Sequence, residues 1–369
     1  MKILFAIKAL DDAQGGAERV LANITSGLAG RGNDVCVLSF DPPGGESFYP
    51  LHEKVERIAL GIGDVKGRAS AGEVVSRMVA VRKAARRVQP DVVIAFMHSS
   101  FIPVSFAMAG TGIPVIGSEH IVPDHYKNRK TEYLLLLLSG FFLKKITVLS
   151  SSIIEGYSPV LRPKMRAIAN PVFPAKEYAE PQGTGAARKI ILNVGRLCLQ
   201  KDQDTLIRAF AMLADKYPDW DLRIIGEGTL RCSLQDTVSE LGLGARIFLP
   251  GTTAEIDKEY QGAHIFALSS KYESFGLATA EAMAHGLPAI GFGSCPGTNE
   301  LIVHNQNGLL VEEEDRVAAF AQGLERLMRD DQLRVDLGKR GLETVKKFHL
   351  DEIVGQWEAL VKRVVEEAI

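Results

Sequence analysis

The sequence has few of the features that are typical of secreted proteins, of proteins with a structural metal site, or of membrane-spanning proteins. Its four cysteines, Cys36, Cys198, Cys232 and Cys295, lack the paired spacing of a structural metal site. So few cysteines fit a chain that folds in a reducing cytoplasm, and they do not indicate a disulfide framework. The formal net charge is only −2, so the chain as a whole is neither a basic nor an acidic polymer.

No apolar run reaches the length of about 20 residues that a bilayer-spanning helix needs. The most apolar segment is 134–143, between the cations Lys130 and Lys144. A helix in the protein core is the favoured interpretation of this segment, and an interfacial helix that dips into lipid is the alternative. Residues 1–7 read as a strand and not as a signal peptide, because no cleavage region follows them. A cytoplasmic location is therefore expected.

Two further kinds of sequence pattern do not indicate a functional site. Gly226-Glu-Gly228 lacks the third glycine of the dinucleotide fingerprint, as does Gly15-Gly16, so NAD binding is not expected. The segments 202–204 and 219–221 match the D-x-D pattern of metal-dependent sugar transferases. We interpret both as structural, because the first begins a helix and the second precedes a strand. No metal and no other cofactor is expected.

Strand-like and helical segments alternate from end to end, which is typical of an α/β protein. With 369 residues, 46% of them hydrophobic, the chain is long enough for two domains of about 100–200 residues each. The Pro- and Gly-bearing segment 175–187 is the best linker between them. The predicted strands form two sets, 2–7, 34–40, 91–96, 114–117 and 146–150 in the first, and 190–194, 221–225, 246–249, 264–268 and 288–291 in the second.

The most informative stretch is 273–281, in which two carboxylates bracket a Phe-Gly turn. It follows a predicted buried strand and opens an apolar-periodic helix that Gly286 and Pro288 terminate. A helix that begins near Gly276 presents free N–H groups and a partial positive end, which suit a phosphate. Glu273 and Glu281 then suit the hydroxyls of two different sugars. Alternatively, Glu273 caps the helix and Glu281 is a solvated surface residue.

Two cations follow the predicted strand 190–194. Its continuous apolar run is consistent with a buried parallel strand, and Gly195 allows the backbone to approach a ligand closely. Arg196 and Lys201 then lie beyond the carboxyl end of the strand, where open parallel sheets bind ligands. They suit a diphosphate leaving group, which gains negative charge as its bond to a sugar breaks. Two solvated surface cations are the alternative.

These residues together resemble the retaining glycosyltransferases of family four. The resemblance rests on the order and spacing of several motifs and covers nearly the whole chain, with further matches at 15–19, 119–120, 170–172 and 296–302. The family implies the GT-B fold, in which two Rossmann-like, doubly wound parallel-sheet domains face each other across a cleft. By this resemblance the domains are 1–174, which binds the acceptor, and 188–351, which binds the nucleotide-sugar, with the apolar-faced C-terminal helix, 352–369, packing back on the first.

The resemblance also assigns roles by position. Arg196 and Lys201 would neutralise the diphosphate, Glu281 would hold the ribose, and Glu273 would hold donor-sugar hydroxyls. The donor site would comprise Gly195, Arg196, Lys201, Glu273, Ser274, Phe275, Gly276, Leu277 and Glu281, with backbone N–H groups around 275–277 on the phosphates. Gly15, Gly16 and His120 would face the acceptor and the reacting carbon, and His120 would join Arg196, Lys201 and Glu273 in catalysis. This chain departs from the family pattern in one place, because it has Lys201-Asp202 where many members carry Lys-Gly.

Charge is distributed unevenly between the two halves. Residues 1–180 contain 22 Lys and Arg against 17 Asp and Glu, whereas the remainder contains 21 against 28. A basic first domain would suit an anionic membrane surface or a phosphate-bearing lipid acceptor, and an ordinary solvated face is the alternative.

The role of His98, near the end of a predicted strand, has two interpretations. It either lines the cleft or caps a helix, and we favour the cap.

The predicted function is retaining transfer of a hexose or N-acetylhexosamine from a nucleotide diphosphate sugar to a hydroxyl group. By resemblance, the donor is UDP-linked and the acceptor is a polyprenyl-diphosphate-linked saccharide at the inner face of the cytoplasmic membrane, as in surface polysaccharide or glycan assembly. No nucleic acid is expected as a partner. A UDP-sugar 2-epimerase of the same fold is the main alternative. A dinucleotide-dependent oxidoreductase and a two-lobed solute receptor are further alternatives.

Overall fold

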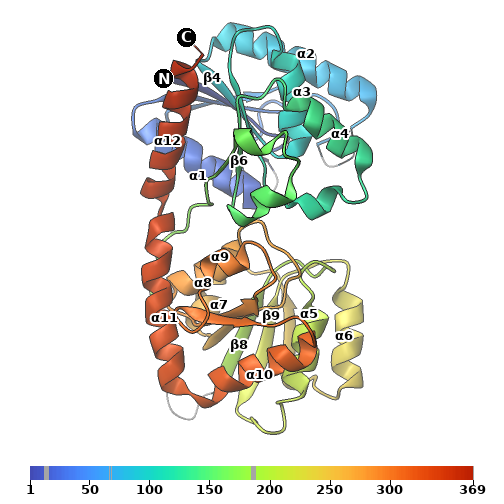
Figure 1. The fold of residues 1–369 in the computed structure, drawn as a ribbon, viewed down its shortest axis with the longest axis vertical. Coiled ribbons are helices and arrows are strands. Elements are labelled where there is room, and N and C mark those ends of the chain that lie inside the picture. The colour runs from blue at the N-terminus through green and yellow to red at the C-terminus, as the bar shows by residue number, and fades with distance from the viewer. Residues whose placement is uncertain (12–15, 66, 68, 184–187, 369) are drawn as a thin grey trace. The chain divides into compact units, whose positions relative to one another are not determined.

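The computed structural model describes residues 1–11, 16–65, 67, 69–183 and 188–368. They form two compact units, the first made of 1–171 and 350–369 and the second of 172–349 (Figure 1). The first boundary falls at Pro171 and Val172, so the expected linker 175–187 lies inside the second unit. Each unit is built on one parallel sheet, as the sequence predicts for an α/β protein.

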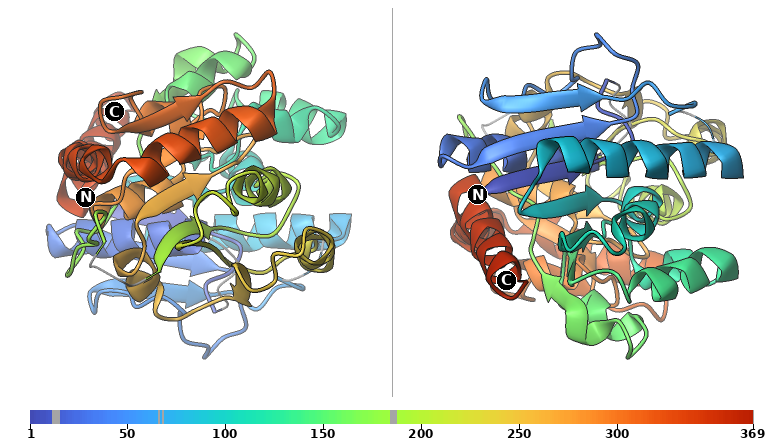
Figure 2. Two further views of the ribbon diagram at one scale, coloured as in Figure 1. Left: turned by 90° about the horizontal axis from the view of Figure 1, so that it is seen from below. Right: turned by 90° about the horizontal axis from the view of Figure 1, so that it is seen from above.

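The first unit contains a seven-stranded sheet in the order β3-β2-β1-β4-β5-β6-β7, with every pair parallel. Figure 2 shows this sheet from above. Its strands are β1 Lys2–Ala6, β2 Asp34–Ser39, β3 Val55–Ala59, β4 Val92–Phe96, β5 Val115–Ser118, β6 Lys145–Val148 and β7 Met165–Ala167. Its helices are α1 Gly16–Gly30, α2 Ala71–Val88, α3 His98–Met108, α4 Lys130–Ser139 and α12 Leu350–Glu366, with short 3-10 helices η1 Pro123–Tyr126, η2 Ser152–Gly156 and η3 Arg162–Lys164.

The second unit contains a six-stranded parallel sheet in the order β10-β9-β8-β11-β12-β13. Its strands are β8 Lys189–Val194, β9 Trp220–Ile225, β10 Ile247–Gly251, β11 Ile265–Leu268, β12 Ala289–Phe292 and β13 Gly308–Val311. Its helices are α5 Gln203–Ala211, α6 Arg231–Glu240, α7 Ile256–Gln261, α8 Leu277–Ala284, α9 Thr298–Leu301, α10 Arg316–Arg329 and α11 Asp331–Val345, followed by the 3-10 helix η4 Lys346–Phe348.

Helices cover both faces of each sheet, as a doubly wound fold requires. In the first unit α1 and α12 lie on one side and α2, α3 and α4 on the other (Figure 1). In the second unit α5, α6 and α10 lie on one side and α8 and α11 on the other. The central strands β1 and β4 are buried along nearly their whole length, which explains their continuous apolar sequences.

In each unit the strand order reverses between two central neighbours, β1 and β4 in the first and β8 and β11 in the second. Crevices form beyond the carboxyl ends of the strands at such a switch point, and ligands bind there in open α/β sheets. In the second unit the loops that leave β8 and β11 begin at Gly195 and Ser269. These loops carry most of the predicted donor-site residues.

The C-terminal helix α12 is part of the first unit. Its apolar stripe is buried, and Trp357 stacks on Phe96 of β4 with ring centroids 5.8 Å apart. Helix α1 approaches closely at Gly27, where an added Cβ would lie 2.5 Å from Val354. The first sheet is therefore covered on this side by residues from both ends of the chain.

Removal of the Trp357 ring tests this packing. Trp357 is only 2% exposed, so Trp357→Ala should lower the free energy of unfolding of the first unit by about 3–5 kcal/mol. Gln356→Ala, at an exposed position of the same helix, should change it by less than about 0.5 kcal/mol. Urea denaturation followed by circular dichroism measures both. Equal transition midpoints for the two variants would contradict the docking of α12.

Candidate active site

The loops after β8 and β11 are joined by an ion pair between Lys201 and Glu273. Lys201 Nζ donates to Glu273 Oε1 at 2.6 Å, and the two side chains are 18% and 9% exposed. Ser270 Oγ donates to the same carboxylate oxygen at 2.6 Å. Because this charged pair is mostly shielded from water, removal of either partner would leave a poorly solvated charge. The structure thus brings together two of the predicted donor-site residues.

Gly195 leaves room for the lysine. A Cβ at this position would lie 3.3 Å from both Cδ and Cε of Lys201, which is a tight contact. The backbone N–H of Gly195 donates to the carbonyl of Ile225 at 2.9 Å, which anchors the loop to β9. The space beside Gly195 is thus taken by the stem of Lys201, and the predicted close approach of a ligand to this glycine stays a prediction.

Helix α8 begins as the sequence predicts, and its first turn has no side-chain cap. Its N-cap is Gly276, whose φ of +82° lies in the left-handed region that glycine tolerates best. Glu273 does not cap the helix, so that alternative interpretation is wrong. The first-turn N–H groups have no acceptor within the helix, and together with the helix dipole they favour an anion at this end.

The loop that contains Gly297 packs closely against the backbone that precedes α8. Gly297 has a φ of +77°, and a Cβ there would lie 2.8 Å from the carbonyl oxygen of Glu273. The N–H of Glu273 donates to the carbonyl of Pro296 at 3.2 Å. Phe275 is buried and packs edge-on against Phe348. The 296–297 segment thus fixes the path of the loop that carries Glu273.

Two further glycines support the loop that carries Arg196. A Cβ at Gly226 would lie 2.1 Å from the carbonyl oxygen of Gly195, and one at Gly228 would lie 2.2 Å from that of Leu197. Backbone contacts this close exclude any side chain. The Gly226-Glu-Gly228 sequence therefore has a structural role, in supporting this loop.

Arg196 is exposed at the start of this loop. Within the part of the chain that the structure describes, its guanidinium group has no ion-pair partner. Its backbone carbonyl accepts a hydrogen bond from Gln203 Nε2 at 3.0 Å, which fixes the main chain at this point. Arg196 is thus a charge that remains available to a ligand.

Asp202, the residue after Lys201, adopts a backbone conformation that glycine would favour. Its φ is +50° and its ψ is 45°, in the left-handed region that Asp tolerates better than most residues. Its carboxylate accepts from Thr205 Oγ1 at 2.9 Å and from Arg316 Nε at 3.1 Å. Ser269 Oγ donates to the carbonyl oxygens of Lys201 and Asp202. These bonds hold the turn without glycine.

Glu281 lies in the second turn of α8 and is partly buried. Tyr260 of α7 donates its hydroxyl hydrogen to Glu281 Oε2 at 3.2 Å, and its ring stacks on His285. Ser274 and Leu277, on either side of the Phe-Gly turn, are also partly buried. Tyr260, Ser270 and Arg316 are supporting residues that the sequence analysis missed, because nothing in their local sequence indicates which loop they reach.

His120 follows β5 in the first unit. Its Nε2 lies 3.0 Å from Ser118 Oγ, and its ring packs on Phe96. Burial lowers the pKa of His120 to about 4, so the ring is neutral at pH 7. Gly16 is the first residue of α1 and is exposed, and Gly15 lies outside the described residues. Glu119, next to His120, is buried and accepts the hydroxyl hydrogen of Tyr126 at 2.7 Å.

In each D-x-D segment, the carboxylate of the second aspartate binds side chains of the second unit. Asp204 pairs with Arg208 and accepts from Thr237, while Asp221 pairs with Arg188 and Arg246. The loops at the switch point of the second sheet thus carry an exposed arginine, a paired lysine and the start of α8.

Comparison with known proteins identifies the family to which the chain belongs. The family model "Glycosyl transferases group 1" matches residues 175–344, and "Glycosyltransferase Family 4" matches residues 14–174. The chain belongs to the family-four glycosyltransferases, and its fold is GT-B. The chain is therefore a glycosyltransferase of this type.

Two bacterial relatives match over nearly their full length. An uncharacterized glycosyltransferase of Haemophilus influenzae is 27% identical over 98% of this chain and 99% of its own. An α-1,4-N-acetyl-D-galactosaminyltransferase of Campylobacter jejuni is also 27% identical, over 99% of both chains. The name of the second specifies an undecaprenol-diphosphate-linked saccharide as its substrate.

Solved structures show the same fold. Sucrose-phosphate synthase from Thermosynechococcus elongatus has a TM-score of 0.84 and 20% identity, with all of both chains covered. The Anabaena protein HepE, solved in complex with UDP, has a TM-score of 0.77 and 18% identity, over 98% of this chain and all of that one. Among the described residues of the present chain, no helix has the length and apolarity needed to cross a membrane.

Gly195→Ala tests the contact with Lys201. The added methyl group should displace the lysine, and kcat/KM should fall roughly 10- to 100-fold, because small displacements at a catalytic group have effects of this size. Stability should change little, because the flexible lysine stem can move. Steady-state kinetics and thermal unfolding measure the two effects. An unchanged kcat/KM would show that the position of Lys201 over Gly195 is unimportant for turnover.

Proposed function

We propose that the protein is a retaining glycosyltransferase that moves a hexose or N-acetylhexosamine from a UDP-linked donor to a hydroxyl group of a lipid-linked saccharide. The observation that carries this proposal is the Lys201–Glu273 pair beside the uncapped end of α8. The second unit binds the donor, and the first unit binds the acceptor.

The donor diphosphate binds to positive groups that the second unit already presents. An ammonium group has three N–H donors, so Lys201 can keep its bond to Glu273 and still bind phosphate oxygens. Arg196 adds a planar guanidinium group, which suits phosphate. The first-turn N–H groups of α8 supply further donors without any side chain or metal.

The two carboxylates bind the rings on either side of the diphosphate. Glu281 is oriented by Tyr260, and a carboxylate has about four acceptor sites, so ribose hydroxyls can bind as well. Glu273 is held by Lys201 and Ser270, and it binds hydroxyls of the donor sugar. The UDP complex of the structurally similar Anabaena protein supports a uridine nucleotide.

Transfer proceeds without a covalent enzyme intermediate. The bond from the sugar anomeric carbon to the diphosphate oxygen breaks, the acceptor oxygen attacks from the same face, and the departing phosphate takes the acceptor proton. Glu273 is not the nucleophile in this scheme, because its carboxylate is engaged by Lys201 and Ser270. Catalysis comes from positioning and from stabilisation of the charge that develops on the leaving group.

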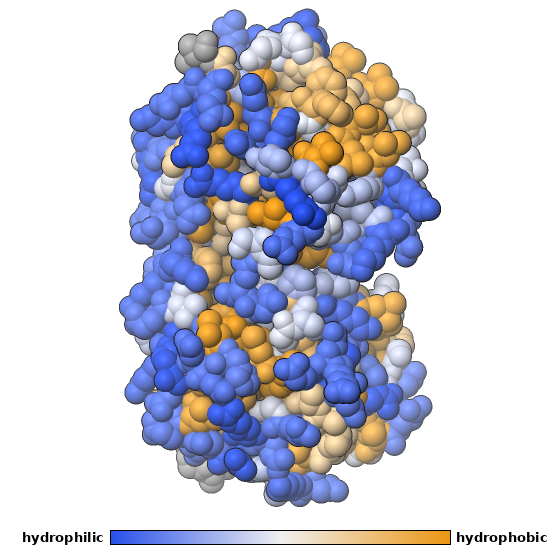
Figure 3. Space-filling model, viewed as in Figure 1, coloured by the Kyte–Doolittle hydropathy of each residue, from blue (hydrophilic) through white to orange (hydrophobic). Residues whose placement is uncertain are grey.

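The first unit has an exposed apolar surface that suits a lipid-linked acceptor at a membrane. This apolar patch consists of Leu134, Leu135, Leu138, Phe141 and Phe142, which are 55%, 41%, 43%, 75% and 44% exposed. In Figure 3 apolar residues gather over α3 and α4 in this unit. The interpretation of 134–143 as a core helix is therefore wrong, because α4 buries only one side, including Leu136 and Ser139.

Basic residues flank the apolar patch in sequence. Lys127 and Lys130 precede it, and the exposed Lys144 follows it. An amphipathic surface of this kind lies in the interface of a bilayer, with aromatic rings among the acyl chains and cations near anionic headgroups. The undecaprenol-linked substrate in the name of the Campylobacter jejuni relative supports this choice of acceptor.

Arg196→Ala tests the donor site. The variant should lower kcat about 100-fold or more, because the guanidinium group acts on charge that develops on the leaving diphosphate. The assay measures acceptor-dependent release of UDP or GDP from a panel of sugar nucleotides, and NMR of the product identifies its anomer. Arg329→Ala, an exposed arginine on α10, is the matched control and should keep wild-type rates.

Several results would contradict parts of this proposal. An unchanged kcat/KM in Arg196→Ala would remove the arginine from the mechanism, and a change in KM alone would limit it to ground-state binding. Inversion at the anomeric carbon would exclude retention. Conversion of a UDP-sugar without acceptor would indicate the epimerase alternative.

Phe141→Ser with Phe142→Ser tests the apolar patch. Binding to vesicles that contain phosphatidylglycerol should weaken at least about tenfold, because each buried phenylalanine contributes about 1.5–3 kcal/mol. Vesicle sedimentation measures binding, and neutral phosphatidylcholine vesicles test the charge contribution. Phe248→Ser, at a 39% exposed position of the second unit, is the control. Equal binding by the double variant and wild type would show that this patch does not contact lipid.

A further inference from the structure

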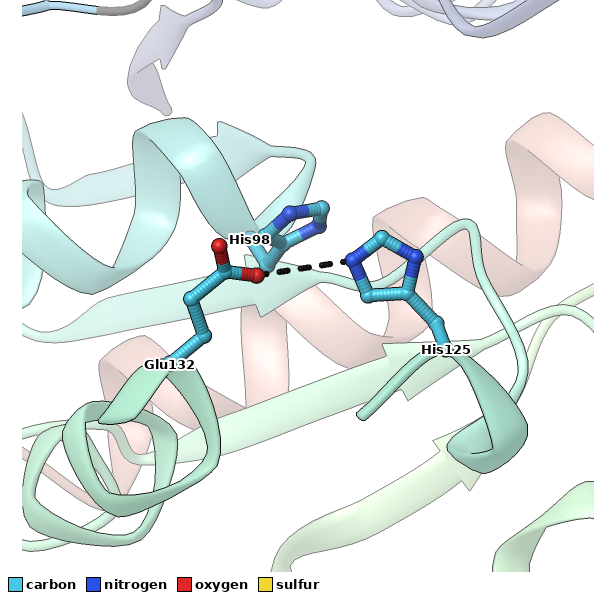
Figure 4. A group of neighbouring side chains, drawn as sticks. All are labelled: His98, His125 and Glu132. Carbon is cyan, nitrogen blue, oxygen red and sulfur yellow. Dashed lines mark ion pairs between the residues drawn. The ribbon is translucent and has the colours of Figure 1, made fainter. Parts of the chain in front are cut away.

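Three side chains from separate elements of the first unit converge at the carboxyl ends of β4 and β5. His98 is the first residue of α3, His125 lies in η1, and Glu132 lies in the first turn of α4 (Figure 4). One ligand atom from each lies within 4.8 Å of the others. The proposed donor site and the apolar patch do not include any of these three residues.

Two imidazole nitrogens in this cluster are buried without a hydrogen-bond partner. Among the described residues, neither His98 Nδ1 nor His125 Nε2 has a partner, although both atoms are shielded from solvent. His125 Nε2 lies 3.5 Å from Glu132 Oε2, beyond a good hydrogen bond but within an ion-pair distance. Buried polar atoms almost always have a partner, and an ion bound between His125 and Glu132 is one way to supply it for His125 Nε2.

The expected capping role of His98 is wrong. The N-cap of α3 is Met97, which has no side-chain cap bond, and the His98 ring lies beside that of His125 with centroids 5.0 Å apart. Tyr126 packs edge-on against both rings. The two imidazoles are therefore held in place by aromatic contacts.

A buried carboxylate lies behind His98. Glu119 Oε1 is 3.8 Å from His98 Nδ1. The carboxylate is itself fixed by the hydroxyl of Tyr126 at 2.7 Å and by the N–H of His120 at 3.0 Å. A carboxylate in this position commonly orients a metal-binding histidine and selects its tautomer, which leaves the other ring nitrogen for the metal.

We propose that His98, His125 and Glu132 bind a divalent transition-metal ion, with Zn²⁺ as the best fit. Two imidazoles and one carboxylate are a donor set that zinc uses, with a fourth position open to water or to an oxygen of a bound molecule. Mg²⁺ and Ca²⁺ prefer oxygen ligands only. The sequence gives no signal for this site, because the three ligands follow no metal-binding spacing and meet only through the fold.

The geometry needs a small adjustment to accept the ion. Ligand atoms around tetrahedral zinc lie roughly 3.3 Å apart for bond lengths near 2.0–2.1 Å. The three side chains must therefore close by at most about 1.5 Å, which rotation of partly exposed side chains allows.

Arg129 competes with the ion for Glu132. Its Nη1 lies 3.3 Å from Glu132 Oε1 and 3.4 Å from Oε2, the oxygen that also faces His125. Removal of the Arg129 charge should therefore leave metal affinity equal to or higher than that of the wild type. This expectation is specific to a metal site, because loss of a structural ion pair alone would not strengthen metal binding.

The test uses the purified full chain after treatment with a chelator. Zn²⁺ is titrated in competition with a chromophoric chelator, and Co²⁺ binding is followed by its visible absorption. We expect one ion per chain, no competition by Mg²⁺, and affinity at least about tenfold weaker in His125→Ala and in Glu132→Gln. His52→Ala, elsewhere in the first unit, is the matched control, and Arg129→Ala should bind at least as tightly as wild type.

The competing outcomes are distinct. Absence of stoichiometric Zn²⁺ or Co²⁺ binding by the wild type would overturn the proposal. So would equal affinity in wild type and Glu132→Gln, which is a conservative change and keeps the test valid if a histidine variant fails to fold. Weakening in His52→Ala to the same degree would show adventitious surface binding. Metal-free circular dichroism spectra establish that each variant is folded.

Discussion

The ion pair between Lys201 and Glu273 is the interaction on which the donor site depends. It joins the loops that leave β8 and β11, the adjacent strands at which the order of the second sheet reverses. Both side chains are largely removed from water, so each charge is stabilised mainly by the other. The ion pair therefore holds the two loops at a fixed separation. The exposed Arg196 and the end of α8 then lie on loops whose positions this pair constrains.

Close backbone packing supports the same loops. Gly226, Gly228 and Gly297 each stand where an added Cβ would lie less than 3.0 Å from backbone atoms. Asp202 shows that the left-handed turn after Lys201 can be made without glycine when a carboxylate is bound by Thr205 and Arg316. Backbone shape therefore positions the charges, and the charges provide the proposed chemistry.

In the first unit, the exposure of two groups of side chains differs from what their local sequence indicates. The apolar patch on and after α4 is exposed, although its run of leucines and phenylalanines is typical of a core helix. The polar cluster of His98, His125 and Glu132 is partly buried, although none of its members lies in a recognisable motif. In both cases the environment of a side chain depends on the packing of η1, α3 and α4 and not on local composition.

The α/β class, the central strands and the start of α8 followed from the sequence alone, because burial on both faces imposes continuous apolar runs and helix ends have local signals. The edge strands β3 and β7 were not predicted because they lack a continuous apolar run, and the edge strand β13 is apolar but only four residues long. Only the tertiary structure decided that Lys201 meets Glu273, 72 residues further on, and that α4 faces solvent. Periodicity records which side of an element is buried, but chain topology determines which loops meet.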